Sequence, residues 1–316
     1  MKKLLIAILV LALAFVGCEK SSKNEEKIVI GLSQSTMASP FYVSMVEAMK
    51  EQAAALGVEL IVTDANEDVL RQNQDIADML ERGINALILN AVDPDGVFPS
   101  VAAAAARNVP IVTVDRFVNA NVAAIVGRDN ALMGAAVGEA VVAAIGGKGN
   151  ARGVILEVMG SAGDRVQEAR SRGFRSVVDR EPGIQVIQSP YSNYVRSLAA
   201  VATMDIIQAR KDITVVYGHN DDMSLGALQV MEDAGMQVLV AGVDGLMEAV
   251  GAIMNGRYLA TAANDPFSMG RVSVDVAVKL AKGETVPSET DPGSFLIDAS
   301  NAQQLYEPAL MFARAR

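Results

Sequence analysis

A regular alternation of two segment types runs through almost the whole chain and limits the folds open to it. Short apolar runs rich in β-branched residues alternate with longer segments whose apolar residues recur every three or four positions. The first pattern is typical of strands buried on both faces, and the second of amphipathic helices. Strand–helix–strand units of this kind favour a parallel sheet with helices on both faces and right-handed crossovers.

The alternation occurs twice, without a repeat of fixed period. The first round predicts strands and helices in turn at residues 28–32, 40–56, 58–62, 69–82, 86–89, 97–107, 110–114 and 122–126. The second round predicts helices and strands in turn at 130–145, 153–157, 164–180, 185–188, 195–210, 213–217, a helix after 220, 237–243, 247–255, 259–262 and 267–282, with an edge strand at 295–297. Because both rounds share their order of elements, we expect two similar doubly wound α/β lobes.

The N-terminus has the pattern of a processed segment. A basic start precedes an uninterrupted apolar run at residues 4–16, which is too short to span a bilayer comfortably. The run ends at Gly17 and Cys18, the only cysteine, and resembles a bacterial lipobox, although Phe15 stands where leucine is usual. We therefore predict a signal peptide at 1–17, lipidation of Cys18 that anchors the protein to a membrane, and a periplasmic or cell-surface location. An ordinary secretion signal with an incidental cysteine is the alternative. The polar residues 18–27 are expected to form a flexible tether.

The composition weighs against several function classes. The chain has 37 acidic and 27 basic residues, a balance that argues against nucleic-acid partners. The sequence has one histidine and one cysteine, and it contains no nucleophile elbow or phosphate-binding loop. These features argue against an enzyme, and no cofactor is expected. A carboxylate pair, Asp115 and Asp244, could imitate a glycosidase pair, so a carbohydrate-active enzyme stays as an alternative.

Polar side chains recur just after the expected strands. They are Ser35, Ser39, Asn90, Asp115, Arg116, Asn220, Asp244 and Asn264. In doubly wound sheets these positions lie on the carboxyl edge, where ligands bind. If the carboxyl edges of two lobes face each other, carboxylates, amides and a guanidinium line one cleft. Such groups can bond each hydroxyl of a sugar or polyol as donor or acceptor.

These motifs together resemble the sugar-binding proteins of bacterial ABC importers, of the ribose-binding type, over about residues 28–287. The quoted segments are Ser39-Pro40-Phe41-Tyr42, Asn90 in Leu-Ile-Leu-Asn, Asp115-Arg116, Asp129-Asn130 with Gly134, Asn220-Asp221-Asp222-Met223-Ser224-Leu225-Gly226-Ala227, Val243-Asp244-Gly245 and Ala262-Ala263-Asn264. The resemblance implies ligand contacts from these motifs, with Phe41 or Tyr42 flanking the sugar ring and Tyr194 over it. The sequence is similar to the family pattern except at three positions.

The departures leave the identity of the sugar open. Ser39 replaces an amide, and Arg128 stands where a small residue is usual. The family's arginine position is interpreted as occupied by Glu168, with Arg165 nearby. Arg128 is then expected either to pair with Glu168, to meet an acidic ligand, or to brace the lobes.

The resemblance implies lobes made of 28–129 with 265–287 and of 130–264 with 288–316, joined by a three-strand hinge. It also implies a monomer that closes on a sugar or polyol and hands it to an ABC permease. A sensory receptor lobe is the alternative that the sequence cannot separate from import. A repressor's effector domain shares the fold, but the export signal argues against it.

Single residues also have plain structural interpretations. Asn220 could serve only as a helix N-cap, and Asp221 and Asp222 are expected to begin the helix. Asp115 and Arg116 could pair with each other on the surface. His219, with no partner nucleophile or metal ligand in the chain, is assigned to a turn or surface position.

Overall fold

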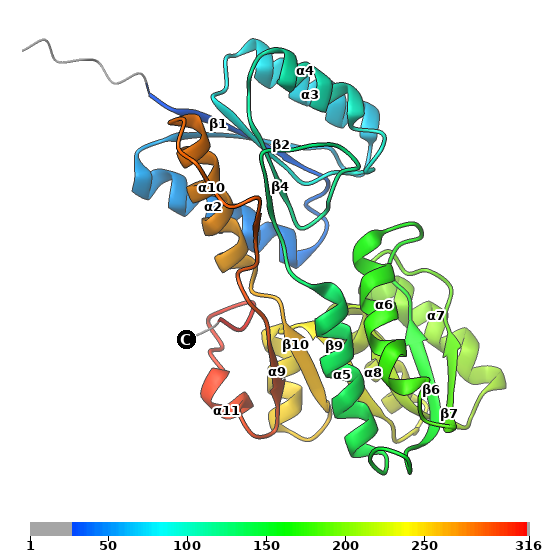
Figure 1. The fold of residues 1–316 in the computed structure, drawn as a ribbon. Helices are drawn as coiled ribbons and strands as arrows, with labels where there is room; N and C mark the ends of the chain where they lie inside the picture. The colour runs from blue at the N-terminus through cyan, green and yellow to red at the C-terminus, as the bar shows by residue number, and fades with distance from the viewer. Residues whose placement is uncertain (1–26, 315–316) are drawn as a thin grey trace, which may run out of the picture.

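The computed structural model describes residues 27–314, which form two α/β lobes stacked one above the other (Figure 1). The predicted signal peptide at 1–17, Cys18 and nearly all of the predicted tether lie outside the described residues. Within the described range, no helix combines the length and apolar character needed to cross a membrane.

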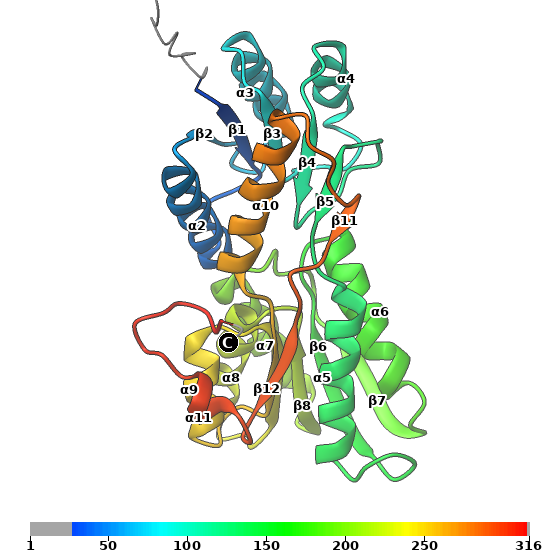
Figure 2. The same cartoon turned by 60° about the vertical axis from the view of Figure 1, so that its left-hand side comes forward.

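The first lobe has a sheet in the order β11-β5-β4-β3-β1-β2. Its strands, all paired in parallel, are β1 (Val29–Gln34), β2 (Glu59–Asp64), β3 (Ala86–Leu89), β4 (Ile111–Val114), β5 (Ala124–Val126) and β11 (Glu289–Thr290). One face packs on α2 (Pro40–Leu56) and α10 (Pro266–Ala281), and the other on α3 (Val69–Glu81) and α4 (Phe98–Ala106) (Figure 2). Side chains of β3 alternate between these two cores, as a strand buried on both faces requires.

The second lobe repeats the plan with the sheet order β12-β10-β9-β8-β6-β7. Its strands are β6 (Arg152–Val158), β7 (Gly183–Gln188), β8 (Ile213–Gly218), β9 (Leu239–Asp244), β10 (Ala260–Ala263) and the antiparallel edge strand β12 (Phe295–Asp298). Its helices are α5 (Asn130–Ala144), α6 (Arg165–Val178), α7 (Arg196–Ala209), α8 (Asp221–Asp233), α9 (Met247–Met254) and the short α11 (Ala302–Leu305). The predicted fold class of two doubly wound parallel-sheet lobes is confirmed, as is the edge strand near 295–297.

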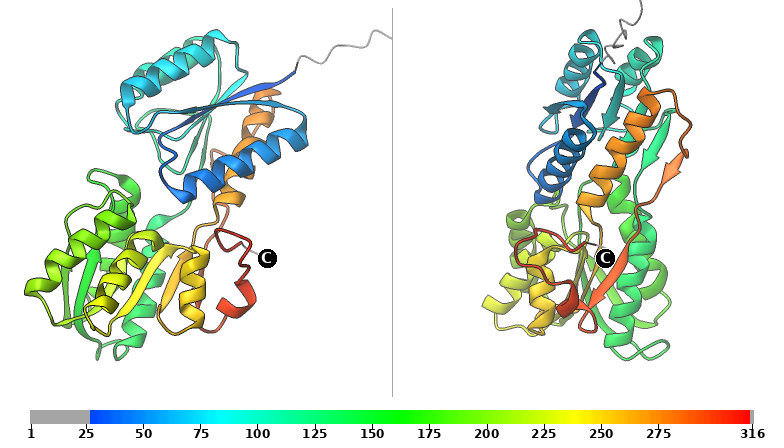
Figure 3. Two further views of the ribbon diagram at one scale, coloured as in Figure 1. Left: turned by 180° about the vertical axis from the view of Figure 1, so that it is seen from behind. Right: turned by 90° about the vertical axis from the view of Figure 1, so that its left-hand side faces the viewer.

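Three segments connect the lobes, as the right-hand view of Figure 3 shows. They lie between β5 and α5, between β10 and α10, and between β11 and β12. The last one corrects an expected boundary. Because Glu289 and Thr290 pair with β5 in the first sheet, the chain leaves the first lobe after residue 290 and not after 287.

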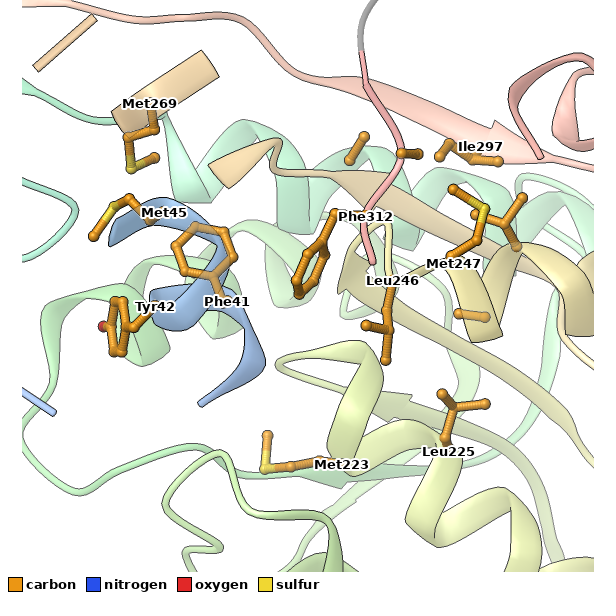
Figure 4. Packing of buried hydrophobic residues seen from close by; sticks show 14 of the residues in the cluster. Phe41, Tyr42, Met45, Met223, Leu225, Leu246, Met247, Met269, Ile297 and Phe312 are labelled. Carbon is orange, nitrogen blue, oxygen red and sulfur yellow. The ribbon is translucent and has the colours of Figure 1, made fainter. Parts of the chain in front are cut away.

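The C-terminal tail brings apolar side chains of both lobes together near the hinge. Phe312 faces Phe41 of α2 edge-on, with ring centroids 5.8 Å apart (Figure 4). The tail is fixed to the second lobe by backbone hydrogen bonds from Ala313 N–H to the Gly245 carbonyl and from Met247 N–H to the Met311 carbonyl, both 2.8 Å. One apolar cluster therefore extends across the lobe boundary.

Glycines let α5 and α6 approach each other closely. A Cβ atom at Gly173 would lie 1.9 Å from the Ala131 carbonyl oxygen, and one at Gly134 would lie 2.2 Å from the Arg170 carbonyl oxygen. Any side chain at either position would force the helices apart. This contact holds Arg170, on α6, against the first turn of α5.

Candidate functional site

The carboxyl edges of the two sheets enclose a cavity of about 480 Å³. Both lobes contribute to its wall. Nine of the predicted ligand contacts line it, namely Ser39, Phe41, Tyr42, Asp115, Arg116, Tyr194, Asn220, Asp244 and Asn264. Most of them follow parallel strands, which end at the same edge of each sheet. Phe41 and Tyr42 lie in the first turn of α2, and Tyr194 lies between β7 and α7.

Asp115 and Arg116 form the polar wall of the first lobe. The Tyr42 hydroxyl donates to Asp115 Oδ2 at 2.9 Å and accepts from Arg116 Nε at 3.1 Å. Arg116 pairs with Glu67 and not with Asp115, so the interpretation as a self-paired surface bridge is wrong. Burial raises the pKa of Asp115, while the nearby Arg170 opposes this shift. Asp115 lines the cavity, and its Oδ1 receives no hydrogen bond from the described residues.

Asp244 and Arg170 form the corresponding wall of the second lobe. Arg170 Nη2 donates to Asp244 Oδ1 at 3.0 Å, and Asn264 Nδ2 donates to the same oxygen at 3.3 Å. Burial raises the pKa of Asp244 to about 6, even though Arg170 stabilises the charged form. As at Asp115, one oxygen is held by the protein and Oδ2 has no donor within the described residues.

Arg170 is fixed by three partners before any ligand arrives. Its Nε donates to Asn130 Oδ1 at 2.9 Å, and its Nη1 donates to the His219 carbonyl at 2.5 Å. Burial favours the neutral form, but Asp244 together with further acidic neighbours, Asp115 among them, outweighs it and raises the pKa of Arg170, so the guanidinium stays charged. A buried cation with three fixed acceptors is a rigid part of the cavity wall.

Two polar residues at the cavity also begin helices. Asn220 is the N-cap of α8 and accepts from Met223 N–H at 2.9 Å through Oδ1. Ser39 is the N-cap of α2 and accepts from Phe41 N–H at 3.3 Å. For Asn220 the cap leaves the amide nitrogen available to the cavity. The structural and the ligand-binding interpretations of Asn220 are therefore compatible.

Tyr194 borders the cavity from the second lobe. Its hydroxyl donates to Asp164 Oδ2 at 2.6 Å, and its ring lies against Gly160, where a Cβ atom would come within 2.6 Å of the ring. Whether the Tyr194 ring stacks on a ligand stays a prediction.

Left-handed backbone conformations gather around the cavity. Seven non-glycine residues of the described chain have positive φ angles, and five of them line the cavity, namely Glu67, Asp115, Asn193, Tyr194 and Asp244. Such conformations cost about 1–3 kcal/mol each and persist where the surroundings impose them. Their concentration here marks the cavity as the functional site of the molecule.

Two predicted contacts are corrected by the structure. Arg128 does not line the cavity. Its guanidinium donates to the Gly293 carbonyl at 2.6 Å, to Asn264 Oδ1 at 3.3 Å and to the Asp265 carbonyl at 3.1 Å. It therefore connects all three hinge segments, which corresponds to the bracing alternative. The alternative pair with Glu168 is not formed.

Glu168 is exposed on the outer face of α6 and lies outside the cavity. The arginine expected at that position is Arg170, two residues later. Helical periodicity would have found it, because the buried face of α6 carries Val166, Gln167, Arg170, Gly173 and Phe174, whereas residue 168 points away. The sequence interpretation also missed Glu67 and Asp164, although both lie in loops that follow strands, β2 and β6.

Ser35 and Asn90 lie beneath the cavity wall. Both are fully buried, and the Ser35 hydroxyl and both polar atoms of the Asn90 amide have no hydrogen-bond partner within the described chain. They do not line the cavity in this conformation. Their contact with a ligand stays a prediction.

His219 lies in the bend between β8 and α8, as the turn alternative predicted, but it is fully buried, so the surface alternative is wrong. Nδ1 accepts from Gly160 N–H at 3.2 Å, and Nε2 lies 3.0 Å from Glu157 Oε1. These partners define a neutral ring that donates through Nε2, in agreement with the lowered pKa of His219 that burial causes. The His219 carbonyl accepts a hydrogen bond from Arg170, so His219 helps to position this arginine at the cavity.

Asp221 does begin α8, but it is also fully buried. It accepts from the Tyr258 hydroxyl at 2.7 Å, from the Thr261 hydroxyl at 2.8 Å and from Leu246 N–H at 2.8 Å. Burial raises the pKa of Asp221 to about 7. Its role is to fix the loops that carry Asp244 and the hinge.

The site offers hydrogen-bonding groups and little reactive chemistry. Between residues 27 and 314, no group of three His, Cys, Asp or Glu side chains is arranged to hold a metal ion. The cavity presents one free oxygen of Asp115 and one of Asp244 from opposite lobes. Two hinged lobes that enclose such a cavity define the class of bilobed solute-binding proteins.

Comparison with known proteins identifies the family. The family model described as a periplasmic binding protein domain matches residues 30–285, and the chain belongs to this family. The family is one of extracytoplasmic solute-binding proteins, and several relatives are binding proteins of ABC transporters.

Individual relatives cover most of the chain. The ribose import binding protein RbsB of Bacillus subtilis is 31% identical over 84% of this chain and 86% of its own length. The xylitol-binding protein of Mycolicibacterium smegmatis is 30% identical over 89% of this chain and 80% of its own. The crystal structure of an ABC transporter solute-binding protein from Mycobacterium smegmatis with bound glycerol has 47% identity and a TM-score of 0.88, covering 92% of this chain and all of that one.

Proposed function

We propose that this protein captures one monosaccharide or a related polyol in the cavity between its lobes, closes on it and delivers it to an ABC permease. The observation that carries the proposal is the pair of half-satisfied carboxylates. Asp115 and Asp244 each keep one oxygen occupied by protein donors and leave the other to the cavity. Two acceptors on opposite lobes suit a ligand with hydroxyl groups on both of its sides.

Closure follows from the same arrangement. A ligand that bonds to Asp115 in one lobe and Asp244 in the other is fully bound only when the lobes approach each other. Its differential affinity then shifts the hinge towards the closed state. The permease recognises that state, so empty protein does not compete for transport. The relatives known as import binding proteins support this role.

A thermal-shift screen over pentoses, hexoses, furanose forms, alditols and sugar acids tests the proposal. Binding to the native state raises the melting temperature by mass action, so a hit needs no labelled ligand. Asp115→Ala should abolish the shift because buried ligand donors lose their acceptor. Asp212→Ala is the matched control, since Asp212 is an exposed carboxylate of the second lobe that pairs with Arg210 away from the cavity. A screen in which no sugar stabilises the protein would refute sugar binding.

Transport is tested separately from binding. Liganded protein should stimulate ATP hydrolysis by a permease and ATPase encoded beside its gene and reconstituted in liposomes, and empty protein should not. Stimulation of a neighbouring kinase in place of the ATPase would favour the sensory alternative. Lipidation of Cys18, and with it membrane anchoring, is checked by mass spectrometry of the exported protein.

A further inference from the structure

The cavity contains a guanidinium that is already occupied by a carboxylate of the protein. Arg116 Nη1 donates to Glu67 Oε2 and Arg116 Nη2 donates to Glu67 Oε1, both at 3.1 Å. Its Nε donates to the Tyr42 hydroxyl at 3.1 Å. The two parallel bonds from Arg116 to Glu67 have the fork geometry with which arginine binds any carboxylate. Glu67 therefore takes the place that the carboxylate of an acidic ligand would need.

The backbone that presents Glu67 is held in an unfavourable conformation. Asn66 and Glu67 have φ angles of 51° and 60°, and glutamate is not among the residues that adopt left-handed conformations readily. Glu67 N–H donates to the Ser35 carbonyl at 2.8 Å, and Asp68 N–H donates to the Ala65 carbonyl at 3.0 Å. These bonds fix the loop so that the Glu67 side chain reaches the cavity mouth, where half of it remains exposed. A strained loop at a binding site points to a role there.

The other two guanidinium groups of the cavity wall also have protein partners. Arg170 pairs with the carboxylate of Asp244 deep in the second lobe, whereas Arg165 donates to the neutral amide oxygen of Asn119 and pairs with no carboxylate of the described residues. Five carboxylates line the cavity against three guanidinium groups; they are Glu67, Asp93, Asp115, Asp164 and Asp244. An acidic ligand would meet a net negative wall in which Glu67 and Asp244 already pair with two of the three guanidinium groups. A neutral ligand would not be affected in this way.

We propose that Glu67 is a specificity-determining residue that occupies Arg116 and restricts the cavity to uncharged sugars and polyols. This inference rests on the proposed function and narrows its ligand class, because it excludes aldonates and uronates of the same carbon skeleton. The pairing of Glu67 with Arg116 also explains how a cavity with an Asp-Arg pair can discriminate against acidic sugars without a steric barrier.

The test uses ligands of one carbon skeleton, among which the open-chain alditol and aldonate differ only at C1, an alcohol in the first and a carboxylate in the second. An aldose identified in the screen is compared with its alditol and its aldonate by calorimetry, on wild type, Glu67→Gln, Glu67→Asp and Glu81→Gln. Glu81 pairs with Arg107 on the outside of the same lobe, so Glu81→Gln removes the same charge away from the cavity. Wild type should bind the aldose or alditol and discriminate against the aldonate. Glu67→Gln should reduce this discrimination by about tenfold or more, while Glu67→Asp and Glu81→Gln should retain it.

The outcomes separate the two proposals. Unchanged discrimination in Glu67→Gln, with the melting temperature of the empty protein preserved, overturns the role of Glu67. Equal binding of aldose and aldonate by wild type also overturns it and leaves sugar binding intact. Failure of wild type to bind any sugar in the panel overturns the proposed function, and the role of Glu67 with it.

Discussion

Replacing Asp244 by asparagine should weaken sugar binding at neutral pH and remove part of its pH dependence. The substitution keeps the shape of the side chain and its bond to Arg170 Nη2, which an amide oxygen can accept as well as a carboxylate. It changes the cavity-facing atom from a charged acceptor to an amide donor. A ligand hydroxyl can still bond to that donor, but the bond is no longer charge-assisted.

The size of the expected change in sugar affinity follows from two independent considerations. A hydrogen bond to a charged group contributes about 1.5–3 kcal/mol and one between neutral groups about 0.5–1.5 kcal/mol, so the loss is about 1–1.5 kcal/mol, or about tenfold in affinity. Burial raises the pKa of Asp244 to about 6, so at about pH 5 most of the empty protein carries a protonated Asp244. Deprotonation must then accompany binding, which lowers wild-type affinity by about another tenfold.

The sign of the pH effect is therefore fixed. Wild-type affinity should rise with pH through about 6, because the ligand and Arg170 both favour the charged carboxylate. Asp244→Asn should bind about tenfold more weakly than wild type at about pH 8 and approach wild type at about pH 5. A smaller pH dependence remains in the variant, since burial also raises the pKa of Asp115.

Isothermal titration calorimetry in buffers of different ionisation enthalpy measures both the affinity and the protons released. Wild type should release protons on binding near pH 6, and the variant fewer. Parallel affinity curves for the two proteins from about pH 5 to 8 would refute the assignment of Asp244 as a charged ligand contact. Unchanged affinity at about pH 8 would do the same.

Three further predictions follow from the placement of buried and exposed charges. Arg128→Met should lower the melting temperature by several degrees in scanning calorimetry, because it removes bonds to all three hinge segments; a stable variant would contradict the bracing role. Glu168→Gln should leave sugar affinity within about twofold of wild type, since the side chain is exposed outside the cavity; a larger loss would restore it as a contact. Asp221 has a folded pKa of about 7, against an ordinary value of 3.8, so its contribution to the free energy of unfolding is largest at low pH and is lost as pH rises through about 7. Asp221→Asn should therefore make the free energy of unfolding in urea fall less steeply between about pH 4 and 8. An unchanged slope would show that other groups cause it.

The fold was predictable because its elements are encoded locally. Apolar periodicity and the alternation of strands with helices gave both sheets, and strand ends gave six of the nine predicted residues that line the cavity, while the family resemblance gave Phe41, Tyr42 and Tyr194. Arg170 was within reach of the same reasoning, because it shares a helix face with Gly173 and Phe174. Glu168 was chosen by alignment to a motif, and one turn of helical geometry would have excluded it.

The remaining parts of the site depend on tertiary contacts that no local pattern specifies. Glu67 meets Arg116 across 49 positions of sequence, and His219 meets Glu157 across 62. A lone histidine after a strand has the same sequence pattern whether it is exposed or buried beside a glutamate. The hinge contacts of Arg128 could not be predicted either. Its partners include the backbone carbonyls of Gly293 and Asp265, which every residue type has, so no side chain in the sequence marks them as partners.

The positive φ angles of Asp115 and Asp244 link the local sequence to the geometry of the site. A strand that ends in Asp115 or Asp244 would normally continue into a turn with glycine where φ is positive. Here a carboxylate occupies the strained position, and Gly245 follows directly after Asp244 with a positive φ of its own. The strain turns each carboxylate so that one oxygen meets a protein donor and the other the cavity. Replacing such an aspartate by glycine would relax the backbone and remove the acceptor, so the strained conformation supports the proposed role of that acceptor in ligand binding.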